Sequence, residues 1–280
     1  MTTAAVPAVP ATPARTRAVP PAPRRPGLPG TLRSELTKIL SVRSTYWTLL
    51  AQAVASIGWA VLFCAGTVSH GKGSAFDAAQ ASLLGQVALG ELIIVVLGAL
   101  VITSEYSTGM IRTSLAVMPR RGVLYAAKAM VFAAVTLTMS LVTSFVAFFV
   151  GQAILSSKHY NTTLAQPGVL RAVLLSAAIV AVFGLLAFGA GAIIRHTAGA
   201  ITSIFGVIFL IPQLAQALPN SWFADVVRWL PGGEALSPIA RSAPPISDHL
   251  FSAWGEFAVF SGYAVVLLAV GAWLFIRRDA

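Results

Sequence analysis

The sequence has a single cysteine and few charged residues. Only 10% of its 280 residues are Asp, Glu, Lys or Arg, whereas a soluble domain carries about 25%. One cysteine, Cys64, excludes an internal disulfide and a cysteine-rich metal site. The hydrophobic share is 57% and the mean hydropathy is +0.81, so a water-soluble globule would have too little polar surface to cover itself. The composition predicts a membrane protein.

Acidic residues and catalytic motifs are also scarce. Nine acidic against 19 basic residues give a formal net charge of +10, which would suggest a nucleic-acid partner in a soluble chain. In a membrane protein such residues flank the spans instead, so no nucleic-acid binding is predicted. The sequence contains neither His-Glu-x-x-His nor Gly-x-Ser-x-Gly. We expect no catalytic residues, no metal site and no cofactor bound by this chain.

The first 30 residues differ in composition from the rest. They hold eight of the sixteen prolines, four arginines and no acid, a mixture that buries too little surface to fold alone. We expect a disordered cytoplasmic tail over 1–30, with weak attraction to anionic lipid as the functional alternative. From Thr31 onward, apolar residues recur at helical spacing between Arg33, Lys38 and Arg43. This pattern predicts a basic amphipathic helix along the membrane surface.

Residues 31–280 form one predicted transmembrane domain. Six apolar segments reach the roughly 20 residues needed to cross a hydrocarbon core about 30 Å thick. Arg195 and His196 interrupt a long apolar stretch and require a turn at an interface between the fourth and fifth segments. The fold class is therefore an all-α membrane protein with six transmembrane helices, at 46–67, 83–103, 125–155, 169–194, 197–218 and 254–276.

The basic residues predict the orientation of these spans. With the N-terminus inside, 14 of the 19 Lys and Arg residues lie on the inner side, including Arg112, Arg120, Arg121 and Lys128 between spans two and three. Loops rich in Lys and Arg stay in the cytoplasm. Both termini are therefore predicted to be cytoplasmic.

Glu91 is an acidic residue inside the second predicted span. A charge in hydrocarbon costs several kcal/mol, so this carboxyl should be protonated, paired or turned toward a polar cavity. Two interpretations stay open. Either Glu91 is neutral and bonds to a neighbouring helix, or it contacts a substrate or a proton.

A second acid, Glu105, stands at the predicted cytoplasmic end of the same span. Gly109 breaks the helix after it, and Met110, Leu115 and Met118 form an apolar ridge beyond the break. The pattern predicts a short cytoplasmic amphipathic helix between spans two and three, with exposed methionines that pack adaptably against partners. This helix either rests among lipid headgroups or docks to a cytosolic protein, and we favour docking.

Several segments together resemble the membrane subunits of type-2 ATP-binding-cassette exporters, in the form common in high-GC actinobacteria. They are 41–47 (SVRSTYW), 105–112 (EYSTGMIR), 119–121 (PRR) with Lys128 beyond, and 195–200 (RHTAGA), within a likeness that runs from about residue 32 to 280. The resemblance implies a permease of the bacterial inner membrane, with a cytosolic ATPase as obligatory partner that binds the ATP and Mg. It also implies a second permease copy, in a four-subunit complex.

By position, residues 105–118 match the family's coupling helix. The resemblance therefore implies that seven residues couple this chain to the ATPase: Glu105, Tyr106, Gly109, Met110, Arg112, Leu115 and Met118. The family's mechanism transmits ATPase closure as rigid-body motion. Span four contains the small residues Gly184, Gly189 and Gly191. We therefore expect close helix contacts there that can shift during transport.

The predicted external stretch 219–253 is too long for a simple connector. Phe223, Val227 and Leu230 share one apolar helical face. We expect a short external helix before span six, capping the outer mouth in agreement with the family's external gate. A surface helix without a gating role is the alternative.

Two other functions remain open. A proton-coupled secondary carrier would use Glu91 as its titrating group, although such carriers usually contain internal repeats and none is recognisable here. A non-transporting membrane scaffold is the third hypothesis. The substrate cannot be read from the sequence, and an apolar path only mildly favours a hydrophobic drug, antibiotic, lipid or peptide.

Overall fold

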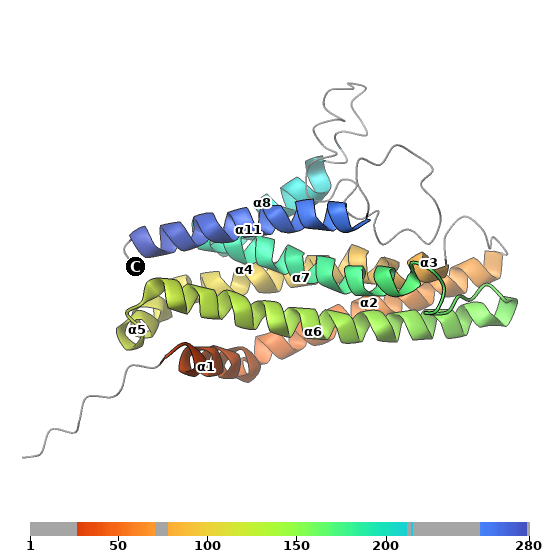
Figure 1. Ribbon diagram of the computed structural model, residues 1–280, viewed down its shortest axis with the longest axis horizontal. Coiled ribbons are helices and arrows are strands. Elements are labelled where there is room, and N and C mark those ends of the chain that lie inside the picture. Colours follow the sequence, from red (N-terminus) through yellow and green to blue (C-terminus); the bar gives the residue numbers. More distant parts are fainter. Residues whose placement is uncertain (1–26, 71–77, 212–213, 215–252, 279–280) are drawn as a thin grey trace, which may run out of the picture.

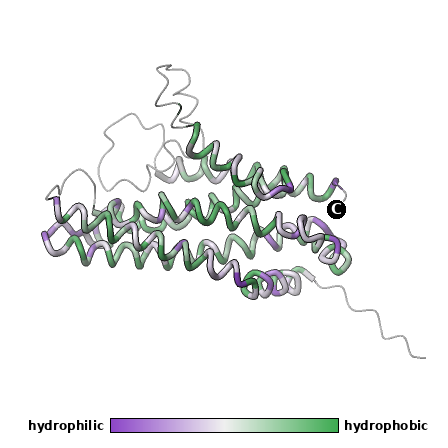
Figure 2. The backbone as a smooth tube through the Cα atoms, turned by 180° about the vertical axis from the view of Figure 1, so that it is seen from behind, coloured by the Kyte–Doolittle hydropathy of each residue, from purple (hydrophilic) through white to green (hydrophobic). Residues whose placement is uncertain are grey.

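A computed structural model describes residues 27–70, 78–211, 214 and 253–278. Every regular element in these ranges is helical. Figure 1 shows the long helices running along a common axis, and Figure 2 shows apolar residues along their lengths with hydrophilic ones gathered toward the ends. Five helices of the described residues are long and apolar enough to cross a membrane. They are α2 (Arg43–His70), the run from α3 to α4 (Ala78–Ser107), α6 (Arg121–Leu155), α7 (Val169–Ile194) and α11 (Ala253–Arg277).

The fifth predicted span, 197–218, is described only in its first part. α8 (Thr197–Phe205) and the π-helical turn η3 (Gly206–Leu210) form an apolar helix shorter than the five spanning ones. The remainder lies outside the described residues, as does the external helix predicted around Phe223, Val227 and Leu230. The six-span layout and the external gate therefore stay predictions.

The predicted turn between spans four and five is confirmed. α7 ends at Ile194, and Arg195 adopts a left-handed conformation with φ 58°. His196 then caps α8, because its Nδ1 accepts a hydrogen bond from the Gly199 N–H at 3.2 Å. Two polar residues thus reverse an apolar chain whose composition alone would continue as one helix.

α7 lies at the centre of the bundle and packs against α4, α6, α8 and α11. Its glycines allow the close contacts predicted for them. A Cβ atom on Gly98 of α4 would strike the backbone of Gly184, and one on Gly191 would lie 2.6 Å from Ile102 Cγ2. Gly189 similarly approaches Leu267 of α11. The backbones of the central helices are therefore near one another without side chains between them.

The second span contains an irregularity that the sequence reading missed. α3 (Ala78–Gly85) and α4 (Glu91–Ser107) are joined by a π-helical turn, η1 (Gln86–Gly90). Gly85 lies so close to α2 that an added Cβ would collide with the Ser56 carbonyl oxygen. Such π-helical insertions are frequent at functional sites.

α1 (Leu28–Ser41) confirms the predicted N-terminal amphipathic helix. It begins three residues before the expected boundary at residue 31, with Pro29 in its first turn, where a missing N–H does no harm. Val42 is extended and separates α1 from α2. Residues 1–26, which hold most of the predicted disordered tail, lie outside the described residues.

One end of the bundle carries most of the basic residues. α1, the short helix α5 (Met110–Val117) and the C-terminal end of α11 meet there, as Figure 1 shows, and we refer to it as the α5 end. Arg33, Lys38, Arg43, Arg112, Arg120, Arg121, Lys128, Arg195, Arg277 and Arg278 belong to elements at this end. The distribution agrees with the predicted cytoplasmic side, which stays a prediction.

Candidate functional site

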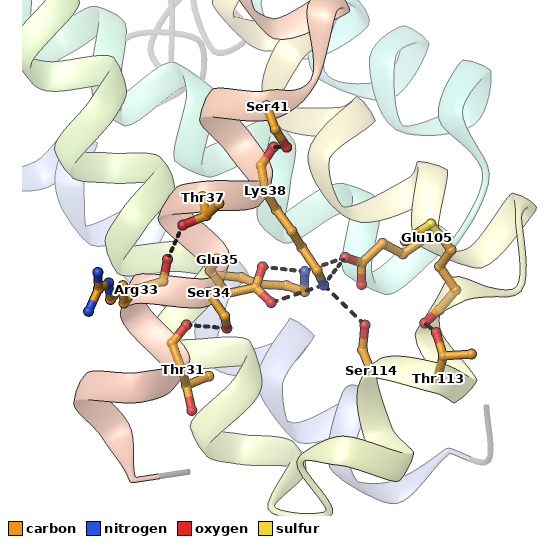
Figure 3. Close-up of polar contacts among 12 residues, drawn as sticks. Thr31, Arg33, Ser34, Glu35, Thr37, Lys38, Ser41, Glu105, Thr113 and Ser114 are labelled. Carbon is orange, nitrogen blue, oxygen red and sulfur yellow. Dashed lines mark hydrogen bonds and ion pairs between the residues drawn. The ribbon is translucent and has the colours of Figure 1, made fainter.

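Four charged side chains meet inside the protein at the α5 end. Lys128 lies two turns into α6 and its side chain is 2% exposed; its Nζ is 2.7 Å from Glu35 Oε2 of α1 and also pairs with Glu105 Oε1 near the end of α4. Lys38 Nζ of α1 lies 3.2 Å from Glu35 Oε1 and 3.3 Å from Glu105 Oε1. Figure 3 shows Glu35 and Lys38 of α1 converging with Glu105 of α4. We refer to Glu35, Lys38, Glu105 and Lys128 as the ion cluster.

The ion cluster balances two positive and two negative charges. Removing an ion from water costs several kcal/mol, which only close opposite charges offset. Burial lowers the pKa of Lys38, but the attraction of Glu105 and Glu35 outweighs it, so that this pKa is raised. One carboxylate oxygen, Glu105 Oε2, is buried without a hydrogen-bond partner among the described residues. The cluster fastens α1 to α4 and α6.

Gly109 sets the direction in which the chain leaves α4. Its φ of 70° is a left-handed value that glycine adopts without a steric penalty. The Gly109 N–H donates to the Tyr106 carbonyl oxygen at 3.3 Å and thereby closes the helix end. α5 begins at the next residue. Its Ser114 Oγ then accepts a hydrogen bond from Lys38 Nζ at 3.1 Å, which attaches α5 to the ion cluster.

α5 has an inner and an outer face. Ile111 and Met118 are buried and Leu115 is half-buried, all three against the bundle core. Met110 and Val117 point outward, with 48% and 68% of their surface exposed. The expectation of exposed methionines is thus confirmed for Met110 and wrong for Met118, which follows the end of α5 and packs into the core of the bundle. Arg112 is exposed.

Further contacts join the ends of the long helices around α5. The Arg195 guanidinium lies 4.9 Å from the centre of the Tyr106 ring. Thr103 Oγ1 is 2.7 Å from Thr197 Oγ1, linking α4 to α8. Arg121 Nη1 donates to the Arg278 carbonyl oxygen at 2.7 Å. α4, α6, α8 and α11 are therefore mutually braced at this end.

The predicted coupling residues divide into four groups. Glu105 is buried and Tyr106 is half-buried against Arg195, and both hold helices together. Gly109 makes the turn. Met110 and Arg112 are exposed, whereas Leu115 and Met118 pack inward.

Glu35 was not identified from the sequence, and Lys128 was assigned to a loop instead of a helix. Lys128 was counted with the loop between spans two and three, yet α6 already begins at Arg121. A signal was present, because residue 128 falls inside the predicted span 125–155 and a lysine there requires a counter-ion. Glu35 is the acid on the preceding amphipathic helix that supplies it.

A second polar region lies in the middle of the bundle. Gln52 Nε2 of α2 donates to Gln86 Oε1 in the π-helical turn at 3.0 Å, and Gln86 Nε2 donates to the Ser140 carbonyl oxygen at 3.3 Å. Ser144 Oγ and Ser176 Oγ lie 2.9 Å apart. Polar residues recur every fourth position along the buried face of α6, a spacing that is visible in the sequence. They are Thr136, Ser140 and Ser144.

Glu91 is fully buried near the middle of the Ala78–Ser107 run. Neither carboxyl oxygen has a hydrogen-bond partner among the described residues, so the expected bond to a neighbouring helix is not found there. Glu91 precedes Ile94 by three residues and so shares its helical face; Ile94 packs against Gly184 of α7. Glu91 is thus a buried carboxyl without a hydrogen-bond partner among the described residues.

The described residues contain no group of three or more His, Cys, Asp or Glu side chains that could hold a metal ion. No family model matches the chain, and none of the curated proteins is significantly similar to it. What the chain does must be inferred from the contacts above and from the motifs in its sequence.

Proposed function

We propose that this chain is the membrane-spanning permease subunit of an ATP-binding-cassette exporter in a bacterial inner membrane. It provides the path for the substrate, and a separate cytosolic ATPase binds ATP with Mg and supplies the energy. A second permease copy completes the complex. The observation that carries the proposal is α5, a short helix held rigidly at the basic end of an apolar bundle with one face uncovered.

The uncovered face of α5 has the chemistry of a docking surface. Met110, Thr113 and Val117 are all exposed and follow one another at helical spacing. A flexible methionine beside a branched apolar residue suits a hydrophobic groove on a partner protein. Arg112 and Arg120 flank this face and are exposed, so an acidic rim on the partner would be complementary.

The connections of α5 give a route for motion into the membrane. A displacement of α5 would be transmitted to α1, α4 and α6 through Ser114 and the ion cluster. α4 in turn contacts central α7 backbone to backbone at Gly98 and Gly184. Because packed interiors are stiff, the helices should tilt as bodies rather than deform. Glu105 is in this scheme a positioning residue that keeps α5 in place.

The proposal is tested by placing a charge on the outer face of α5. Val117→Arg should abolish co-purification of the ATPase encoded in an adjacent reading frame, and with it ATP-dependent transport in vesicles. Thr37→Arg is the matched control, since Thr37 is exposed on α1 at the same end, and it should leave both intact. Full capture and transport in Val117→Arg, with the variant folded, would refute docking through α5.

A second candidate function is supported by Glu91. A fully buried carboxyl with no partner among the described residues is the group expected in a proton-coupled carrier. In that case substrate uptake would follow a pH gradient without ATP, and Glu91→Gln would stop it. ATP-driven transport that survives Glu91→Gln would exclude this function.

A further inference from the structure

An apolar groove of about 620 Å³ opens between α1, α2 and α6. Its size falls in the usual range of ligand sites, about 300–1,000 Å³. Leu36 and Leu40 of α1 form one wall, and the rest is formed by residues of α2, among them Leu50 and Ala53, and of α6, among them Ala134 and Thr138. Three of the four lining leucines, Leu36, Leu40 and Leu50, are 40–50% exposed, whereas Leu49 is buried. The groove therefore faces out of the protein.

The length of the groove along α2 matches the thickness of one lipid leaflet. α2 starts at Arg43, beside the end of α1, and the deepest lining residue on this helix is Ala53. Ten residues at 1.5 Å each place Ala53 about 15 Å beyond Arg43, which is half of a hydrocarbon core roughly 30 Å thick. An acyl chain that enters beside α1 would fill the groove down to the middle of the bilayer.

Two arginines stand at the shallow end of the groove. Arg33 precedes Leu36 by one helical turn, and Arg43 precedes Tyr46, another lining residue, by one turn; both arginines are exposed. Neither forms an ion pair with a described residue, since the nearby carboxylates Glu35 and Glu105 are taken by lysines. Two exposed guanidinium groups that have no ion-pair partner among the described residues, each one helical turn from a lining residue of an apolar groove, match a phosphate next to an acyl chain.

We propose that the groove binds one anionic phospholipid of the leaflet that contains α1. One acyl chain lies against Leu50 and Ala53, and the phosphate lies between Arg33 and Arg43. The lipid fills the angle between α1 and α2 and so supports the bend at Val42. This inference requires a membrane protein but not an ATPase partner, so it can fail independently of the exporter proposal.

Native mass spectrometry of the detergent-purified full chain tests the proposal. The protein is offered equal amounts of dioleoyl phosphatidylglycerol and dioleoyl phosphatidylcholine. Each basic residue near an anionic headgroup is worth about a fivefold preference, so two arginines should give about 30-fold in favour of phosphatidylglycerol. Arg33→Gln with Arg43→Gln should bring the ratio close to one, whereas Arg112→Gln with Arg120→Gln, two exposed arginines away from the groove, should retain it.

The acyl part of the site is tested separately. Ala134→Phe fills the groove and should remove the bound lipid without changing any charge. Ala153→Phe, at an exposed position of the same helix outside the groove, should leave binding unchanged. Equal binding of the two lipids by the unmodified chain would overturn the proposal, as would full binding by Ala134→Phe.

The competing occupant is a second copy of the chain. Leu50→Cys adds an exposed thiol to a chain whose own Cys64 is buried. Oxidation in native membranes should leave this variant monomeric if lipid fills the groove. A disulfide-linked dimer in high yield would assign the groove to protein instead and overturn the lipid proposal.

Discussion

Replacing Lys128 by methionine tests whether the ion cluster holds the α5 end together. The Lys128 ammonium is 2% exposed and pairs with both Glu35 and Glu105. Methionine keeps the length of the side chain and removes its charge. The two carboxylates are then left with Lys38 alone, whose side chain is 37% exposed and therefore partly screened by solvent. The interior keeps an uncompensated negative charge.

The magnitude follows from the burial of the pair. Removing one partner of a buried ion pair destabilises a protein by about 3–5 kcal/mol, because the other charge stays buried. Adding Glu105→Gln to Lys128→Met restores a neutral cluster of Glu35 and Lys38. The double variant should therefore be more stable than Lys128→Met alone, with a coupling energy of about 1–3 kcal/mol. Stability should fall in the order native chain, double variant, single variant.

Thermal unfolding in detergent, followed by fluorescence of the six tryptophans, measures this order. Lys158→Met is the control, since Lys158 is exposed at the far end of the bundle and surface substitutions change stability by no more than about 0.5 kcal/mol. A double variant less stable than Lys128→Met would refute the reasoning. An unfolding temperature of Lys128→Met equal to that of the native chain would also refute it.

Three further predictions concern other regions. Gly98→Val should lower the unfolding temperature, because its side chain would collide with the α7 backbone, while Gly58→Val, with nothing within 4 Å of an added Cβ, should not. The raised pKa of Lys38 means that its stabilisation is complete below pH 10.5 and is lost as the pH rises through the higher folded value. The difference in unfolding temperature between the native chain and Lys38→Met should accordingly be constant from pH 7 to about 10 and shrink above pH 10.5. Glu91→Gln should change stability by less than about 1 kcal/mol, since a buried carboxyl without a partner among the described residues is expected to be protonated and the amide has the same size. A large loss of stability in thermal unfolding would show that Glu91 is charged and paired.

The long helices were predictable because lipid imposes a length and an apolar composition on each of them. The span predicted at 169–194 coincides with α7, and Gly109 and the Arg195–His196 pair mark real breaks. The π-helical turn at Gln86–Gly90 was not predictable, since it depends on the close approach of α2 at Gly85. The local sequence of the second span does not show which other helix will pack against it.

The candidate site was only half predictable. Glu105 drew attention as an isolated acid at a helix end, yet its neighbours Glu35 and Lys128 come from helices far away in the sequence. A single sequence shows that a buried lysine needs an acid, but not which acid supplies it. Which side of the α5 segment is buried depends likewise on the position of the rest of the bundle, and this position buries Met118.

The pairing of Glu35 with Lys128 also constrains the order in which the protein is assembled during translation. The two residues are 93 positions apart. A ribosome adding roughly 5–20 residues per second needs about 5–20 seconds to cover that distance. During that interval α1 has been synthesised, but Lys128 has not. Glu35 of α1 therefore lacks its buried partner, and α1 cannot yet pack in its final position. α1 is therefore fixed late although it is made early, and a nascent chain halted before residue 128 should leave α1 accessible to protease.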